Sequence, residues 1–212
     1  MSDFVLDYVA SRPQSTLMIK YLLFLRRIKF EPRVIYDIGA YNATWYNLVQ
    51  EIFPDVRIII FDASVKNEHY YVDKEHYIAC LSNNEKEIDF YEHKDDDRVK
   101  SYYKPKTISD EESSKISTIT LANIVKKYGL PYPDLIRIDC CGAEKDIIEG
   151  GEDIIKKAKY LITNLQNEEL FINGPLANIT GPYISSLGFE VKNVLDLFNT
   201  PLLDYVFENK NI

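Results

Sequence analysis

Short apolar runs without polar alternation recur along this chain, and each is followed by a polar residue. The first two are Val34–Tyr36 and Arg57–Phe61. Such runs are typical of parallel strands that are covered on both faces. Between them, Trp45, Leu48 and Ile52 fall at helical spacing. The pattern therefore predicts a βαβ unit, for which a right-handed crossover is expected.

The same alternation of elements continues to the C-terminus. The last two apolar segments have no helical segment between them, so they predict an antiparallel hairpin at the sheet's edge. The whole pattern indicates one α/β domain over residues 1–212, a Rossmann-like three-layer sandwich around a mostly parallel seven-stranded sheet. The later strands are expected at 77–81, 134–138, 160–163, 189–195 and 203–207, and the later helices at 121–128, 143–149 and 178–187.

Two segments lie outside this regular pattern. Residues 15–28 carry an apolar stripe one helix face wide, which predicts a helix that packs ahead of the sheet or, as the alternative, one that binds a membrane surface or a partner. Residues 84–117 are charged and aromatic and predict an inserted hairpin and loop, with the polar run 110–115 as exposed loop. Such a loop over a sheet edge is a common place for substrate contacts.

Composition narrows the class of protein. The 212 residues are 46% hydrophobic and carry a net charge of −8, which argues against a protein that coats nucleic acid. Three cysteines, two of them adjacent, give no disulfide framework and favour reduced thiols and a cytoplasmic location. The N-terminus lacks the apolar region of a secretory signal, and no apolar run approaches the roughly 20 residues that span a bilayer.

Polar residues stand where the predicted strands end. In an open parallel sheet these ends meet at one edge, where ligands bind. A single such residue is equally typical of a turn, but their repetition predicts a binding site. They are Asp37, Asp62, Ser82, Asp139 and Asn164.

The turn after the first strand suggests a nucleoside-bearing cofactor. Gly39 allows a sharp bend and close approach to a ligand, and Asn42 could cap the following helix. Asp62, at the end of the second strand, could accept hydrogen bonds from two ribose hydroxyls. A pyrophosphate site would need more glycines than this turn has. A nucleotide-dependent oxidoreductase is therefore the less favoured alternative.

Three segments together resemble the FkbM family of methyltransferases. They are Val34–Trp45 (VIYDIGAYNATW), Phe61–Ala63 (FDA) and Leu135–Glu149 (LIRIDCCGAEKDIIE). The resemblance implies a class I methyltransferase fold, S-adenosyl-L-methionine as cofactor, and O-methylation of a sugar hydroxyl in a glycan or small glycoside. The chain departs from the family at Ala43, Cys141 and Asn164.

The resemblance also assigns residues to the cofactor. Asp37 would face the positively charged methionine end together with Gly39 and Tyr41, Asp62 would bind the ribose, and Ser82 would lie near the adenine. Asp139 would lie near the transferred methyl group. The full set expected at the cofactor is Asp37, Gly39, Ala40, Tyr41, Asn42, Trp45, Asp62, Ala63, Ser82 and Asp139.

Methyl transfer to a hydroxyl benefits from a base that accepts its proton. Asp139 is the first candidate and Glu144 the second, although an acid in the first turn of a helix is also simply favourable there. Asp139 and Asn164 could instead hold a divalent cation such as Mg²⁺, so a metal requirement stays open.

The acceptor side is expected in the insertion. Tyr102, Tyr103 and Lys104 would form a lip for a sugar ring, with His93 nearby. The alternative for this aromatic loop is plain packing on the domain. A non-catalytic interaction module built on the same fold also stays open, because Ala43 and Asn164 depart from the family pattern.

Overall fold

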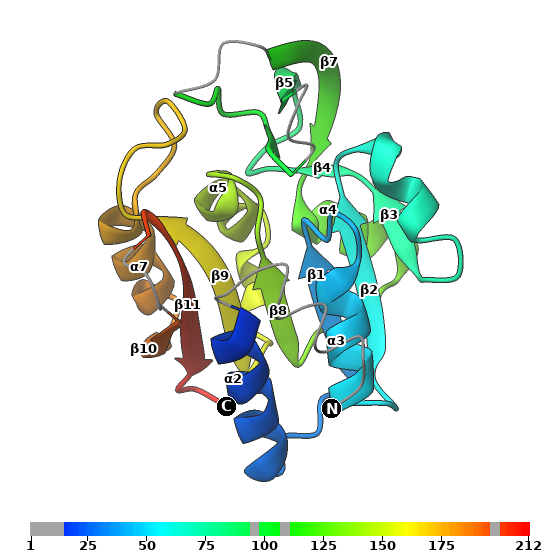
Figure 1. Ribbon diagram of the computed structural model, residues 1–212, viewed down its shortest axis with the longest axis vertical. Coiled ribbons are helices and arrows are strands. Elements are labelled where there is room, and N and C mark those ends of the chain that lie inside the picture. The colour runs from blue at the N-terminus through cyan, green and yellow to red at the C-terminus, as the bar shows by residue number, and fades with distance from the viewer. Residues whose placement is uncertain (1–14, 94–97, 107–110, 196–199) are drawn as a thin grey trace.

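Seven strands form the central sheet, in the order β10-β11-β9-β8-β1-β2-β3 (Figure 1). The computed structural model describes residues 15–93, 98–106, 111–195 and 200–212. The strands of this sheet are β1 (Val34–Ile38), β2 (Arg57–Asp62), β3 (His76–Ile78), β8 (Leu135–Ile138), β9 (Tyr160–Gln166), β10 (Phe189–Leu195) and β11 (Leu202–Asn209).

The strand directions confirm the expected sheet. The pairs that join β1, β2, β3, β8 and β9 are parallel, whereas β11 runs antiparallel to both β9 and β10. Every residue of β1 and β8 is buried, which is why these strands show no polar alternation. A mostly parallel sheet with an antiparallel edge hairpin therefore forms the middle layer.

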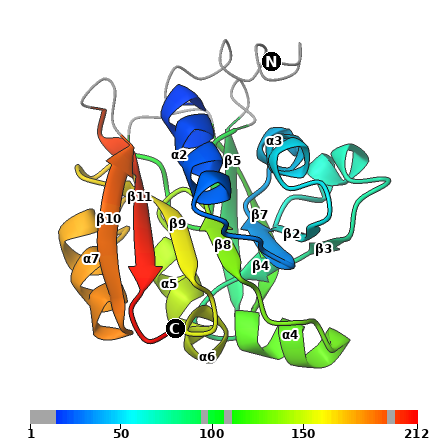
Figure 2. The ribbon, with the colours of Figure 1, turned by 90° about the horizontal axis from the view of Figure 1, so that it is seen from below.

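Helices cover both faces of the sheet (Figure 2). One face packs against α2 (Ser15–Arg27) and α3 (Thr44–Ile52) through one apolar cluster, and the other packs against the remaining helices through a second, larger cluster. The helix predicted at 15–28 is thus α2, and its stripe of Met18, Leu22 and Leu25 is buried against the domain. The remaining helices are α4 (Leu121–Tyr128), α5 (Glu144–Glu149), α6 (Glu152–Ile155) and α7 (Ala177–Ser186).

The third strand differs from its prediction. The expected strand 77–81 is split into β3 and β4 (Cys80–Leu81), because the chain leaves the main sheet at Ala79. Strand β4 pairs instead with β7 (Glu111–Ile119) in a second sheet. An apolar run alone does not reveal that its two ends pair with different neighbours.

The segment between β4 and α4 forms most of that second sheet. Its strand order is β4-β7-β5-β6, where β5 is Glu87–His93 and β6 is Lys100–Ser101. The prediction of a loop at 110–115 is wrong for residues 111–115, which lie in β7 and pair with β5. The polarity of residues 112–115 reflects solvent exposure rather than a turn. Asp110, like the insertion's residues 94–97 and 107–109, lies outside the described residues.

Candidate active site

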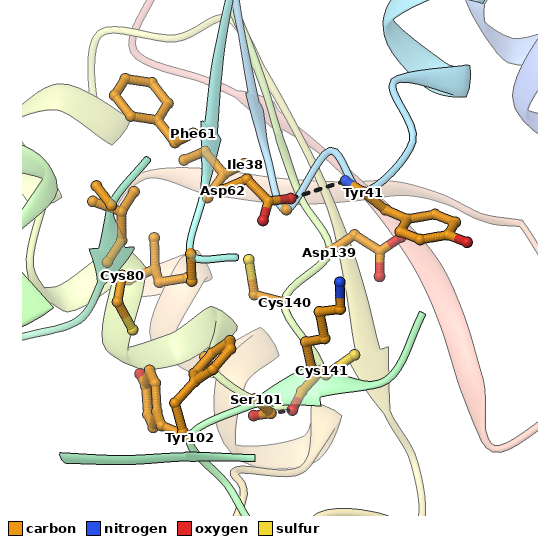
Figure 3. Close-up of a pocket in the computed structure, with 18 of the residues that line it drawn as sticks. Ile38, Tyr41, Phe61, Asp62, Cys80, Ser101, Tyr102, Asp139, Cys140 and Cys141 are labelled. Carbon is orange, nitrogen blue, oxygen red and sulfur yellow. Dashed lines mark hydrogen bonds between the residues drawn. The ribbon is translucent and has the colours of Figure 1, made fainter. Parts of the chain in front are cut away.

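A pocket opens between the carboxyl ends of β1, β2 and β8 and the second sheet (Figure 3). It holds about 680 Å³ of empty space, part of which is open to solvent. Its lining includes Gly39, Tyr41, Phe61, Asp62, Ala63, Asn67, Leu81, Arg98, Lys100, Ser101, Tyr102, Asp139, Cys140, Cys141 and Ile147.

The floor of the pocket depends on Gly39. Its φ is +79°, and a Cβ atom added there would lie 2.2 Å from the carbonyl oxygen of Asp139. Its N–H donates to the carbonyl oxygen of Phe61 over 2.8 Å. Because Gly39 has no side chain, the turns after β1 and β8 can touch. This close approach brings Tyr41 and Asp139 to one cavity.

The rest of the first turn leads into α3. Asn42 turns its side chain toward the helix, where Oδ1 accepts from the N–H of Thr44 over 3.2 Å. The next residue, Ala43, has φ 57° and takes the left-handed conformation that favours glycine. Tyr41 is also left-handed, with φ 50°. The departure from the family pattern at Ala43 is thus accommodated by backbone strain at the entry of α3.

Asp62 ends β2 and faces the pocket. Its carboxylate accepts from the N–H groups of Tyr41 (3.0 Å) and Ser64 (2.8 Å). The Tyr71 hydroxyl lies 2.9 Å from Oδ2, and Nδ2 of Asn67 lies 3.2 Å and 3.3 Å from the two oxygens. The acid is therefore held in one orientation by four neighbouring residues.

Arg137 joins two of the predicted acids. From the middle of β8 it donates through Nη1 to Asp37 over 3.0 Å and through Nη2 to Asp139. The guanidinium carbon, Cζ, lies 5.4 Å from the centre of the Trp45 ring. Burial raises the pKa of Asp37 to about 6, with Arg137 opposing the shift. Asp139 therefore lines the pocket. Asp37 and Trp45 do not line it; both contact Arg137, which in turn holds Asp139.

Glu144 supports the turn after β8. Its Oε1 accepts from the N–H groups of Cys140 (2.8 Å) and Gly142 (3.3 Å). Burial raises the pKa of Glu144 to about 7. The side chain is buried and stands outside the pocket lining, so its contacts fix the segment that follows Asp139.

The prediction that Asn164 ends its strand is wrong. Strand β9 continues to Gln166, because β11 pairs with it as far as that residue. The side chain of Asn164 donates to Oδ1 of Asp204 over 3.0 Å. Among the described residues, no three His, Cys, Asp or Glu side chains are grouped as metal ligands.

The expected acceptor residues separate into three places. Tyr102 lines the pocket, and its hydroxyl and that of Tyr103 donate to the same oxygen of Asp146, over 3.1 Å and 2.9 Å. Lys104 is exposed and accepts through its carbonyl from the N–H of Ile172. His93 lines a neighbouring recess that shares Asn67 and Lys100 with the pocket.

Of the residues expected at the cofactor, half line the pocket and half do not. Those in the lining are Gly39, Tyr41, Asp62, Ala63 and Asp139; those outside the lining are Asp37, Ala40, Asn42, Trp45 and Ser82. Sequence reasoning missed Arg137, for which the available sign was one charge inside an apolar strand. It also missed Asn67 and Lys100, which no local pattern marks.

Comparisons with known proteins agree with this architecture. A family model described as the methyltransferase FkbM domain matches residues 37–191. No curated protein sequence gives a significant match. No helix of the described residues could cross a membrane.

Solved structures share the fold at low identity. One is magnesium protoporphyrin IX methyltransferase from Synechocystis PCC 6803 with bound S-adenosylmethionine (10% identity, TM-score 0.52, 99% of this chain and 86% of that one). A second is the N-methyltransferase NodS from Bradyrhizobium japonicum WM9 with S-adenosyl-L-homocysteine (10%, 0.52, 95% and 90%). A third is an O-methyltransferase family protein from Burkholderia thailandensis (11%, 0.49), of whose length this chain spans 56%.

The family match covers the first turn, Asp62, the second sheet and the turn after β8, so it includes every element that builds the pocket. The fold neighbours share the overall fold across most of the chain. The chain belongs to the FkbM family of S-adenosylmethionine-dependent methyltransferases.

Proposed function

We propose that this methyltransferase transfers a methyl group to a hydroxyl oxygen of a carbohydrate, either a small glycoside or a glycan. The observation that carries the proposal is the placement of Asp139. Its side chain lines the pocket, retains 19% of its exposure and is oriented by Arg137. A carboxylate placed in this way can accept the proton that a hydroxyl loses on methylation.

The pocket residues fit S-adenosylmethionine. Asp62 offers carboxylate oxygens for the ribose hydroxyls, and Phe61, Leu81 and Ile147 offer an apolar wall for the adenine. Gly39 and Tyr41 leave the backbone of the first turn open to the methionine end. When bound, the cofactor supplies an electrophilic methyl group on its sulfonium.

The chain's own residues account for the remaining chemistry. Arg137 pairs with the Asp139 carboxylate and holds it in one orientation. Glu144 fixes the turn that follows Asp139. Tyr102, anchored on Asp146, closes the pocket from the side of the second sheet and keeps water from that part of it.

Binding and turnover of matched variants test the proposal. We expect S-adenosyl-L-homocysteine to bind the wild type in a calorimetric titration, and a mass-spectrometric screen over a glycan panel to give a product heavier by one methylene. Asp139→Asn should lower kcat at least about 100-fold, the usual range for a lost acid–base group, without weakening binding of S-adenosyl-L-homocysteine. Asp62→Ala should weaken that binding by roughly 1–3 kcal/mol.

The opposite results would reject specific parts of the proposal. Binding without turnover on any acceptor would favour the non-catalytic module. Methylation of nitrogen-containing acceptors alone would reject the carbohydrate. If Asp139→Asn weakened binding and Asp62→Ala left it intact, the two acids would have been assigned the wrong way round.

A further inference from the structure

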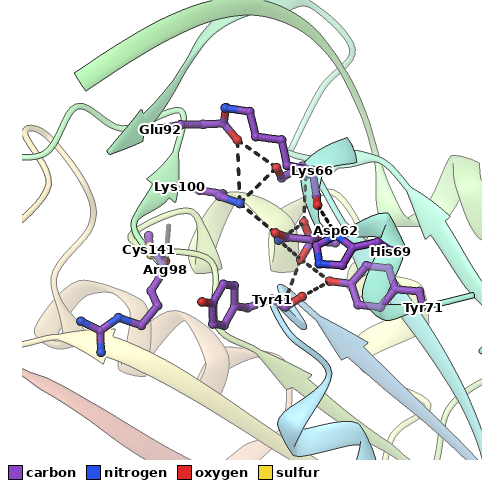
Figure 4. Close-up of polar contacts among 11 residues, drawn as sticks. Tyr41, Asp62, Lys66, His69, Tyr71, Glu92, Arg98, Lys100 and Cys141 are labelled. Carbon is purple, nitrogen blue, oxygen red and sulfur yellow. Dashed lines mark hydrogen bonds and ion pairs between the residues drawn. The ribbon is translucent and has the colours of Figure 1, made fainter. Parts of the chain in front are cut away.

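Lys100 reaches from the second sheet toward the cofactor end of the pocket (Figure 4). It lies on β6, and its side chain retains 10% of its exposure. The ammonium donates to Oδ1 of Asn67 over 2.8 Å and to Oγ of Ser64 over 3.3 Å. An ammonium so buried needs partners, because removing a charge from water is costly.

Asn67 contacts both Lys100 and Asp62 and so links them. It is buried in the 3₁₀ helix η1 (Val65–Tyr70), and its Nδ2 faces both oxygens of the acid. Lys100 can only donate hydrogen bonds and an ionised Asp62 can only accept them. The amide between them therefore has one orientation that satisfies both neighbours.

Asn67 is the neighbour of Asp62 that contacts both carboxylate oxygens, at the longest distances. Its two distances, 3.2 Å and 3.3 Å, are longer than those from the N–H groups of Tyr41 and Ser64 and from the Tyr71 hydroxyl. A carboxylate has about four lone-pair sites. The Tyr71 hydroxyl also lies 2.6 Å from the carbonyl oxygen of Tyr41, which can take its single proton instead. An incoming diol can therefore bind Asp62 while Asn67 stays in place.

A second acid ties Lys100 to the insertion. Glu92, on β5, lies 3.9 Å from the ammonium and accepts from Oγ of Ser64 over 2.8 Å. Its other oxygen pairs with Lys66 over 2.6 Å. The second sheet and the segment after β2 are thus joined by one polar network, which begins at the exposed Lys66 and ends on the buried Asn67 and the ribose-binding acid.

We propose that Lys100 is a positioning residue that couples the second sheet to Asp62 through Asn67. It holds the amide so that the acid stays oriented for a ribose, and it holds β6 so that Ser101 and Tyr102 close the pocket. The inference rests on the proposed cofactor role of Asp62. Cofactor binding at Asp62 and ordering of the second sheet should then stabilise each other.

Calorimetric titration with S-adenosyl-L-homocysteine tests the coupling in the full chain. We expect Lys100→Met to raise Kd about tenfold, and Asn67→Ala to do the same. The double variant should lose less than about twofold more than either single variant, because both changes break one chain of contacts. Lys100→Arg keeps N–H donors and should stay within about threefold of the wild type. Lys115→Met, at an exposed lysine of the same sheet paired with Asp89, should leave Kd unchanged.

Hydrogen exchange in the absence of ligand separates this proposal from the proposed function. Lys100→Met should speed exchange of amides at 64–71 and 98–101, whereas Lys115→Met should not. A wild type that fails to bind S-adenosyl-L-homocysteine would reject the proposed function. The exchange result would still show whether Lys100 orders residues 64–71 and 98–101. Unchanged exchange in Lys100→Met, losses that multiply in the double variant, or Lys100→Arg as weak as Lys100→Met would each overturn the proposal.

Discussion

The carboxylate of Asp37 and the guanidinium of Arg137 lie directly opposite each other on β1 and β8, 3.0 Å apart. Both are buried, and Oδ2 of Asp37 accepts no hydrogen bond from any described residue. Arg137 holds Asp139 with its other nitrogen, so one cation serves two acids. The stability of the sheet and the placement of the candidate base therefore depend on the same side chain.

Removing this cation should be more harmful than removing the pair. Arg137→Met leaves the Asp37 charge buried without its partner, and breaking a buried pair in this way costs about 3–5 kcal/mol. The double variant Arg137→Met with Asp37→Asn removes both charges, so it should recover most of that loss. Urea unfolding of the wild type, both single variants and the double variant measures the recovery.

Turnover should not recover with stability. Asp139 has lost its orienting partner in both Arg137 variants, so kcat should stay low in the double variant although the fold is restored. A double variant with wild-type kcat would show that Arg137 acts on stability alone. A double variant no more stable than Arg137→Met would show that the two charges are not coupled.

Two buried carboxyls should make the protein more stable at pH 5 than at pH 8. Burial raises the pKa of Asp37 to about 6 and of Glu144 to about 7, from ordinary values of 3.8 and 4.5. The folded state then binds protons more tightly than the unfolded chain, so stability is lost as pH rises from about 4 to 7. The Tm should fall by a few degrees over this range in buffers of equal ionic strength.

Matched variants show which carboxyl groups cause the change in Tm with pH. Glu144→Gln and Asp37→Asn should each flatten the change in Tm between pH 5 and pH 8. Glu190→Gln should leave it unaltered, because ion pairs with lysines lower the pKa of Glu190 to about 2, and its contribution is lost only as the pH falls below its unfolded value. A Tm that rises with pH in the wild type would contradict the burial argument.

The central strands of the main sheet, β1, β2, β8 and β9, were predictable because they are buried on both faces. An unbroken apolar run as short as Val34–Tyr36, bounded by polar residues, is typical of such a strand. The second sheet was harder, since its strands are half exposed and their pairing joins segments far apart. The pairing of β4 with β7 links Cys80 to Thr118, and no local pattern encodes that contact.

At the site, the sequence located side chains at the sheet edge but not the direction in which they point. Asp37 looks like a turn residue, yet it lies inside β1 and faces Arg137. Trp45 falls on the apolar stripe of α3 and packs in the core. The contact of Lys100 with Asn67 spans 33 residues, so it appears only when the insertion folds back over β2.

Gly39 should tolerate no side chain. Its left-handed φ and the 2.2 Å approach of its added Cβ to the Asp139 carbonyl oxygen mean that Gly39→Ala forces the two turns apart. We expect the variant to lose S-adenosyl-L-homocysteine binding and at least about 2 kcal/mol of stability, in line with strain at a special backbone conformation. Gly181→Ala is the control, since an added Cβ there meets no atom within 4 Å apart from its chain neighbours and the backbone of α7, in which the residue lies. Because Pro182 follows and disfavours a helical residue that carries a Cβ, we expect little gain in stability and wild-type binding of S-adenosyl-L-homocysteine. Normal binding by Gly39→Ala would show that the turns need not touch.

Ala40 and Ala43 offer a matched pair for measuring strain in the first turn. Both are buried in the same small cluster, but only Ala43 is left-handed, with φ 57°. Ala40→Gly should cost about 1–2 kcal/mol, from a lost buried methyl group of about 0.8 kcal/mol and a more flexible unfolded chain. Ala43→Gly incurs the same losses, but it also relieves a left-handed conformation worth about 1–2 kcal/mol. Its stability in urea should therefore stay within about 0.5 kcal/mol of the wild type. Equal losses in the two variants would show that the turn holds Ala43 without strain, and that the glycine the family commonly has there serves some purpose other than backbone freedom.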